Sequence, residues 1–156
     1  GQLDQGARDA AGGRLSLTTY LADVADCDLV IAAIVEGLAP KQELFAELER
    51  ICRPDAVLAT NTSALSVTEI AATTTTPARV VGMHFFNPAP LMPLVEIIRA
   101  ELAEDGAFET ANAFDEKQVK PPTRCYATPG YVGNRDRIHL LNDSIPTLAS
   151  PRLDVV

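Results

Sequence analysis

A chain of 156 residues is long enough to bury a sizeable core, and a single domain is the natural expectation for this length. Apolar residues make up 47% and charged residues 22%, which is ordinary for a globular protein. The formal net charge of -8 argues against a general surface for nucleic acid or anionic membrane, although a local basic pocket stays possible. No apolar run approaches the roughly 20 residues of a membrane helix, and the first residues lack the pattern of a signal peptide.

The three cysteines, Cys27, Cys52 and Cys125, are widely spaced and odd in number. Their spacing matches neither a metal site nor a disulfide framework, so no metal is expected. We interpret them as buried or idle thiols of a protein from a reducing compartment.

The first third of the chain predicts short elements ahead of a buried strand. Residues 1–13 are typical of the end of a helix, which a pair of glycines stops. Residues 14–18 alternate polar and apolar side chains and predict a short strand, and residues 19–27 predict one or two helical turns. Residues 29–35 are continuously apolar and rich in β-branched side chains, which predicts a buried parallel strand.

From residue 40 onward, helix and strand patterns alternate. Pro40 can begin a helix with an apolar stripe, and Pro54 stops it. Ser66 and Glu69 have the spacing of a capping box. The expected elements are a helix at 40–53, a strand at 56–59, a helix at 66–72, strands at 79–84 and 94–98, a helix at 105–118, a strand at 123–127 and a helix from about 132 to 148. This alternation predicts an α/β fold with a doubly wound, mainly parallel sheet.

Polar residues follow three of the predicted strands. They are Val35-Glu36, Thr60 to Ser63, and His84 to Asn87. Ligands of open parallel sheets bind beyond the carboxyl ends of the strands. We therefore expect these three polar segments to converge on one edge of the sheet.

His84 and Glu96 are the first candidates for chemistry, because one ends an apolar run and the other lies inside the next. Imidazole is the side chain best suited to move a proton near neutral pH. A carboxylate that orients it would complete an acid/base dyad. A histidine beside two phenylalanines is also an ordinary core residue. An unpaired buried carboxylate is costly, however, and its need for a partner favours the dyad.

Several segments together resemble the 3-hydroxyacyl-CoA dehydrogenases, including 3-hydroxybutyryl-CoA dehydrogenase. Residues 83–90 (MHFFNPAP) and 94–98 (LVEII) resemble the motifs HFFNPxP and LVEII of that family. Further similar segments are residues 28–36 (DLVIAAIVE), 41–45 (KQELF), 59–65 (ATNTSAL) and 128–135 (TPGYVGNR), the last of which resembles TPGFxVNR. Their order suits the family over roughly residues 14 to 145.

The resemblance implies oxidation of (3S)-3-hydroxyacyl-CoA to 3-oxoacyl-CoA with NAD⁺, in fatty-acid β-oxidation or in 3-hydroxybutyryl-CoA metabolism. In this role His84 is the general base that takes the proton of the 3-hydroxyl group, and Glu96 orients the imidazole. Ser63 and Asn134 hydrogen-bond the reacting oxygen or nearby groups of substrate and cofactor. Without the resemblance, Ser63 would be part of a generic turn and Asn134 a helix cap or a surface residue.

For the cofactor NAD, the resemblance implies that Glu36 and Lys41 line the ribose side, that Asn87 faces the nicotinamide and that Ser63 contributes from the neighbouring turn. On their own, Glu36 and Lys41 would be solvated charges at the entry of a helix. The implied partner is an acyl-CoA substrate, with neither nucleic acid nor membrane. Family members are typically homodimers of the cytoplasm or the mitochondrial matrix.

The resemblance also divides the chain. Residues 1–127 are the C-terminal part of the NAD-binding Rossmann domain, and residues 128–156 begin a helical domain for substrate binding and dimerisation. Family members carry a GxGxxG loop after their first strand, which this sequence lacks. We expect the chain to begin after the first two strands of the family's sheet. Residues 14–18 are then its third strand, and residues 29–35 its fourth, left as a bare edge.

Smaller departures from the family pattern are Ala32 for Glu, Ala64 for Ser, Gly133 for Val and the charged pair Asp136-Arg137. Two alternatives stay open at this point. The chain could be a truncated or degenerate remnant of the family without catalytic activity, which the missing loop favours. It could also be a sister dehydrogenase that acts on a small hydroxy acid.

Overall fold

A single five-stranded sheet forms the centre of the molecule. The computed structural model describes residues 4–92, 94–117, 122–128 and 131–135. The strands are β1 (Leu29–Ala32), β2 (Val57–Thr60), β3 (Val80–Phe85), β4 (Val95–Arg99) and β5 (Pro122–Tyr126), and they lie in the sheet in this order. All neighbouring pairs are parallel except β3 and β4. The predicted α/β class with a mainly parallel sheet is confirmed.

The antiparallel step between β3 and β4 has a simple cause. Parallel neighbours need a long crossover, usually through a helix, whereas antiparallel neighbours can be joined by a short loop. The segment between Phe85 and Val95 contains no helix in its described part, so β4 returns directly alongside β3. This return brings the side chains of the two strands into cross-strand pairs.

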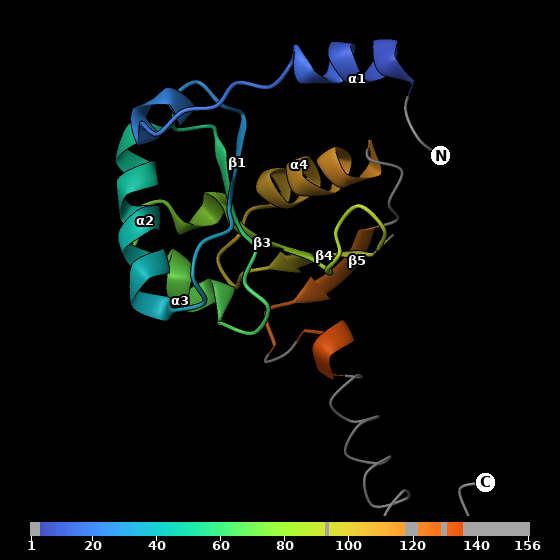
Figure 1. Cartoon of the computed structure of the whole chain (residues 1–156). Coiled ribbons are helices and arrows are strands. Elements are labelled where there is room, and N and C mark those ends of the chain that lie inside the picture. Colours follow the sequence, from blue (N-terminus) through green and yellow to red (C-terminus); the bar gives the residue numbers. More distant parts are fainter. Residues whose placement is uncertain (1–3, 93, 118–121, 129–130, 136–156) are drawn as a thin grey trace, which may run out of the picture.

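Helices cover both faces of the sheet (Figure 1). On one side lie α2 (Leu38–Ile51) and α3 (Val67–Ala71), and on the other side lies α4 (Asp105–Glu116). Two short 3-10 turns, η1 (Leu21–Val24) and η2 (Pro77–Arg79), precede β1 and β3. The first helix, α1 (Gln5–Gly12), lies apart from this body and buries none of its residues.

The helix signals of the sequence correspond to real contacts. Ser66 Oγ accepts a hydrogen bond from the backbone N of Glu69 (3.2 Å), as the capping pattern predicts. Phe45 and Leu48 form the buried stripe of α2, which begins at Leu38, two residues before Pro40. Of the last helix, predicted from about residue 132 to 148, only residues 132–135 are described, and of these residues 133–135 are helical.

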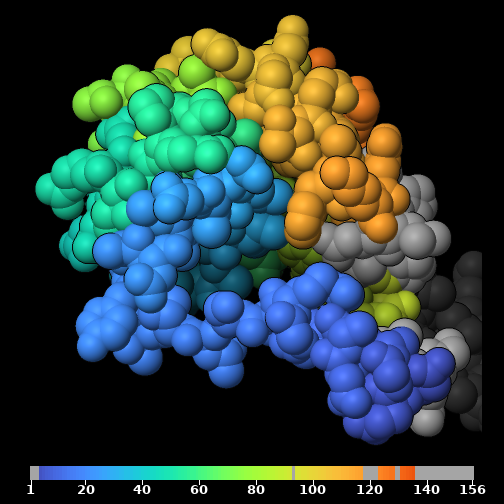
Figure 2. Space-filling view, turned by 90° about the horizontal axis from the view of Figure 1, so that it is seen from above, coloured from blue at the N-terminus to red at the C-terminus, as the bar shows by residue number. Residues whose placement is uncertain are grey.

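The strand predicted at residues 14–18 is wrong, because the structure places this segment in no sheet. Leu15 is 75% and Leu17 99% exposed. A strand needs a neighbour that takes its backbone hydrogen bonds, and the described part of the chain provides none here. Figure 2 shows the N-terminal segment running along the outside of the body. Within the described residues, strand β1 lies at one end of the sheet, as expected, but it ends at Ala32 and not at residue 35.

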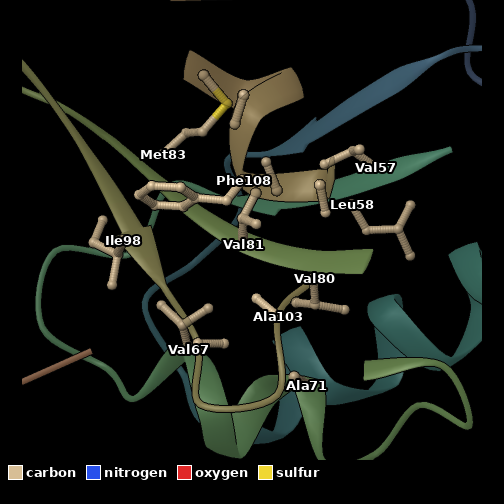
Figure 3. Packing of buried hydrophobic residues seen from close by; sticks show 14 of the residues in the cluster. Val57, Leu58, Val67, Ala71, Val80, Val81, Met83, Ile98, Ala103 and Phe108 are labelled. Carbon is tan, nitrogen blue, oxygen red and sulfur yellow. The ribbon is translucent and has the colours of Figure 1, made fainter. Parts of the chain in front are cut away.

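The core is built from alternating residues of β3 and its covering helices (Figure 3). Val81 and Met83 lie on the side of Phe108 from α4, and Val80 lies on the side of Ala71 from α3. The three residues of β3 are completely buried. The continuous apolar run of β3 is therefore that of a central strand buried on both faces.

The thiols take no part in a disulfide. All three cysteines are free: Cys52 and Cys125 are buried, and Cys27 is exposed. Burial raises the pKa of Cys125 to about 12, and the nearby Glu96 carboxylate adds to this effect. Since the thiolate is the reactive form, Cys125 is an inert core residue. None of the helices in the described ranges has the length and apolar character that crossing a bilayer requires.

Gly82 is required by the close approach of β3 to its neighbours. A Cβ atom at this position would lie 2.8 Å from Ile98 Cβ and 3.0 Å from Val67 Cγ2. Both neighbours are β-branched residues of the packed core, and such side chains have little freedom to move. Glycine at this position lets β4 and α3 pack directly on β3, just ahead of His84.

We predict that Gly82→Ala lowers the free energy of unfolding by about 1–3 kcal/mol, because overpacking a core forces side chains and backbone to shift. Urea unfolding followed by circular dichroism measures the effect. Gly106→Ala is the matched control, since a Cβ at that position of α4 meets no atom within 4 Å. Equal stability of both variants would contradict this account of the packing.

Candidate active site

The three polar segments meet at the carboxyl ends of β1, β2 and β3, as the sequence predicts. Asn61 joins them, because it follows β2 and lies between the other two strands. Its backbone N donates to Ala32 O (2.9 Å), and its side-chain Oδ1 accepts from the backbone N of Phe85 (2.9 Å). The turn after β2 is thereby fixed to the ends of both neighbouring strands.

Glu36 holds the same turn from the side of β1. Its Oε1 accepts hydrogen bonds from the backbone N of Ser63 (2.8 Å) and of Ala64 (3.4 Å), and from the Thr62 hydroxyl. Its Oε2 lies 3.2 Å from Lys41 Nζ. Burial opposes ionisation of this carboxyl, but the hydrogen bonds from Thr62, Ser63 and Lys41 outweigh burial and lower its pKa. Glu36 is therefore a charged anchor for the turn.

Lys41 lies inside the protein, with its side chain 1% exposed. Its ammonium also lies 3.4 Å from Ile34 O, in addition to its pairing with Glu36. A buried ammonium needs such partners, because an unpaired charge in the interior is strongly unfavourable. The contacts observed for Lys41 are thus internal ones that orient Glu36. The contact of both residues with a cofactor ribose stays a prediction.

His84 and Glu96 face each other across β3 and β4, where they form a cross-strand pair. The Nδ1 atom of His84 lies 2.7 Å from Glu96 Oε2, and both side chains are buried. The Phe86 ring is 4.4 Å from the imidazole and the Tyr131 ring 5.9 Å, measured between ring centroids. Because Glu96 occupies Nδ1, the Nε2 atom is the one available for proton transfer.

The second oxygen of Glu96 binds a segment far away in the sequence. Glu96 Oε1 accepts from the backbone N of Val132 (2.9 Å) and of Gly133 (2.8 Å). These two N–H groups give the second oxygen of the buried side chain its hydrogen-bond partners. The sequence predicts the pairing of Glu96 with His84, but nothing in its local pattern indicates this second set of contacts.

The remaining predicted site residues are Ser63, Asn87 and Asn134. Asn134 Nδ2 donates to Ser63 O (2.9 Å), so these two predicted residues are brought together. Ser63 and Asn87 are both exposed. Within the described residues, the Ser63 hydroxyl and the Asn87 side-chain amide make no hydrogen bond, which leaves both groups available to a ligand.

Sequence reasoning missed Tyr131, which is 2% exposed and whose hydroxyl donates to Leu65 O (2.7 Å). Burial raises the pKa of this phenol, so the hydroxyl keeps its proton and acts as a donor. The only available signal was its place within the motif at residues 128–135. Among the described residues, no group of three or more His, Cys, Asp or Glu side chains is arranged to hold a metal ion.

The parallel strands with helices on both faces, and polar residues at their carboxyl ends, define an α/β nucleotide-binding domain of the Rossmann type. It carries a buried histidine–carboxylate pair at that edge. The sequence model of the "3-hydroxyacyl-CoA dehydrogenase, NAD binding domain" matches residues 1–128. The chain belongs to the 3-hydroxyacyl-CoA dehydrogenase family, whose cofactor is NAD.

Known relatives agree with this assignment. The chain is 44% identical over 133 residues to a probable 3-hydroxybutyryl-CoA dehydrogenase of Deinococcus radiodurans, covering 85% of this chain and 48% of that protein. It is 42% identical over 118 residues to the mitochondrial hydroxyacyl-coenzyme A dehydrogenase of Homo sapiens, covering 76% and 38%. The crystal structure of M. tuberculosis FadB2 superposes with a TM-score of 0.91 at 40% identity, covering 98% of this chain and 54% of that one.

The chain thus spans about half the length of these relatives. The exposed Ser63 and Asn87 side chains follow the ends of β2 and β3, where they are free to hydrogen-bond polar groups of a cofactor. In dinucleotide-binding domains the pyrophosphate commonly lies at a glycine-rich loop that begins a helix. Within the described ranges, no strand leads into such a loop, since the first strand, β1, begins at Leu29.

We predict that Glu36→Gln lowers the free energy of unfolding by about 1–2 kcal/mol at pH 7. Breaking a buried ion pair costs about 3–5 kcal/mol, and the 42% exposure of the Glu36 side chain reduces this figure. The carboxyl pKa is lowered from 4.5 in the folded state, so its contribution is complete above pH 4.5 and disappears as the pH falls through the folded value.

Urea unfolding of both proteins between pH 3 and 8, read on the same denaturant scale, tests this expectation. The difference between wild type and variant should be constant near neutral pH and shrink below about pH 4.5. Glu47→Gln, which changes an exposed glutamate of α2, is the control for the charge change. A difference that grows on acidification would refute the assigned role of Glu36.

Proposed function

We propose that this chain is the part of an NAD-dependent 3-hydroxyacyl-CoA dehydrogenase that carries the catalytic residues at the carboxyl edge of the sheet. Residues 1–127 form the C-terminal part of the NAD-binding domain, and residues 128–156 begin the helical domain. The substrate is (3S)-3-hydroxyacyl-CoA and the product 3-oxoacyl-CoA. The single observation that carries this proposal is the buried contact of 2.7 Å between His84 Nδ1 and Glu96 Oε2 at the carboxyl edge of the sheet.

In the proposed mechanism, His84 accepts the proton of the substrate's 3-hydroxyl group at Nε2. Glu96 holds Nδ1, which fixes the tautomer that leaves Nε2 free to accept. The same carboxylate stabilises the imidazolium that forms, because the pair is buried and the attraction between charges is strong where water is excluded. In the reverse direction, the imidazolium returns the proton to the product oxygen.

The neighbouring polar groups orient the substrate. The Ser63 hydroxyl is exposed and free to hydrogen-bond the reacting oxygen. Asn134 uses one amide N–H on Ser63 O, and an amide has a second N–H to offer. Asn87 faces the nicotinamide in this proposal, with its exposed amide free for that contact. NAD⁺, when bound, supplies the hydride acceptor, so the protein needs only to position the reactants and move one proton.

The acyl group proposed for this site is short. Support comes from the relatives, several of which carry the name 3-hydroxybutyryl-CoA dehydrogenase, such as the protein of Clostridioides difficile at 43% identity. The competing possibility is a family member without activity of its own. It is favoured by the absence of a pyrophosphate loop from the described residues, and the following experiment separates the two.

We predict that the chain catalyses NADH-dependent reduction of acetoacetyl-CoA and that His84→Ala lowers kcat by about 10²–10⁴-fold, the usual contribution of a general acid or base. Loss of NADH absorbance measures the rate. Glu109→Gln is the control, since this carboxylate is 57% exposed and pairs with Arg124, away from the dyad. Circular dichroism verifies that each variant is folded.

The outcomes have distinct meanings. If His84→Ala reduces acetoacetyl-CoA at the wild-type rate, His84 is not the general base. A folded wild-type chain that binds NADH but never reduces acetoacetyl-CoA would show that these residues alone are not an enzyme.

A further inference from the structure

The hydroxyl group of Tyr131 has no part in the mechanism above, yet it is held in a defined place. The residue is 2% exposed and has a φ of 49°, which is uncommon for residues other than glycine. Such a backbone conformation persists only where surrounding contacts enforce it. The hydroxyl donates to Leu65 O at 2.7 Å, across 66 positions of sequence.

Tyr131 belongs to a short stretch, residues 131–134, that binds both halves of the site. Asn134 donates to Ser63 O (2.9 Å), which makes a second side-chain contact with the turn that follows β2. The backbone N–H groups of Val132 and Gly133 donate to Glu96 Oε1. The stretch therefore links the turn that carries Ser63 directly to the carboxylate that orients His84.

The opposite side of this turn is already fixed. Glu36 accepts from the backbone N of Ser63 and of Ala64, and Thr62 Oγ1 accepts from the backbone N of Leu65 (3.0 Å). Glu36, which follows β1, thus holds the amide groups of Ser63 and Ala64, and Thr62 closes the turn on itself. Two carbonyl groups of the turn are held by Tyr131 and Asn134, so the turn is fixed between Glu36 and residues 131–134.

We infer that Tyr131 is a positioning residue of the proposed active site. Its hydroxyl fixes the Ser63–Leu65 turn relative to the His84–Glu96 pair, so that the Ser63 hydroxyl and His84 Nε2 address the same substrate oxygen. This inference rests on the proposed function for its catalytic consequence. The clamp itself is a property of the fold and can be measured without turnover.

If Tyr131 had only a structural role, its ring would fulfil that role by packing, and its hydroxyl group would not be needed. The ring lies 5.9 Å from the imidazole, between centroids, and fills the core beside it. Phenylalanine, which stands at this position in the motif TPGFxVNR, would supply the same packing. Tyr131→Phe therefore removes the hydrogen bond and leaves the packing in place.

The first test is amide hydrogen exchange by NMR on the 156-residue chain. Tyr131→Phe should speed exchange at Ser63, Ala64 and Leu65 by about tenfold, the effect of losing one typical hydrogen bond. Leu58 and Ala59 of β2 should change little. Tyr126→Phe is the matched control, because that tyrosine is 76% exposed. Unchanged exchange in the turn, or an equal rise throughout β2, would overturn the inference.

The second test is kinetic. If wild type reduces acetoacetyl-CoA, Tyr131→Phe should lower kcat several-fold while KM for NADH stays the same, and Tyr126→Phe should alter neither. An unchanged kcat in an active enzyme would overturn the positioning role. If wild type shows no turnover, the proposed function fails, while the exchange measurement still decides whether the hydroxyl holds the turn.

Discussion

The carboxylate of Glu96 is the group on which the active edge depends. It is completely buried in β4, where an uncompensated charge would be unfavourable by several kcal/mol. Three contacts compensate it: one to His84 Nδ1 and two to the backbone of residues 132 and 133. One oxygen thus orients the imidazole and the other fixes the stretch that carries Asn134. The His84–Glu96 pair and residues 132–134 are therefore a single hydrogen-bonded unit.

Glu36, which follows β1, has a similar arrangement. One of its oxygens holds the turn that carries Ser63, and the other is paired with the buried ammonium of Lys41. Each carboxylate thus accepts hydrogen bonds from a loop that is remote in sequence. These bonds compensate the carboxylate for its burial and fix the position of the loop. The antiparallel return from β3 to β4 makes the arrangement possible, because it places His84 opposite Glu96. Gly82, two residues before His84 in β3, allows the close packing of β4 and α3 on β3.

Much of the fold follows from local patterns. The apolar runs predict β2, β3 and β4 within one or two residues, and the caps and stripes predict α2, α3 and α4. The dyad is also predictable, since a lone carboxylate in an apolar strand requires a partner. The prediction of a strand at residues 14–18 was wrong for a reason that lies outside the segment. Its alternation is genuine, but a strand exists only when another strand accepts its hydrogen bonds, which no local pattern can reveal. The contacts of Tyr131 and of Glu96 Oε1 join residues 36 to 66 positions apart, so they too depend on the completed fold.

The most direct test of the central role of Glu96 is the tautomer of His84 in the wild-type chain at pH 9, read from the imidazole ¹⁵N chemical shifts. We expect Nδ1 to carry the proton, with a slowly exchanging low-field ¹H resonance that Glu96→Gln abolishes. A proton on Nε2 in the wild-type protein would contradict the account, because His84 could not then accept a proton at the nitrogen that faces away from Glu96.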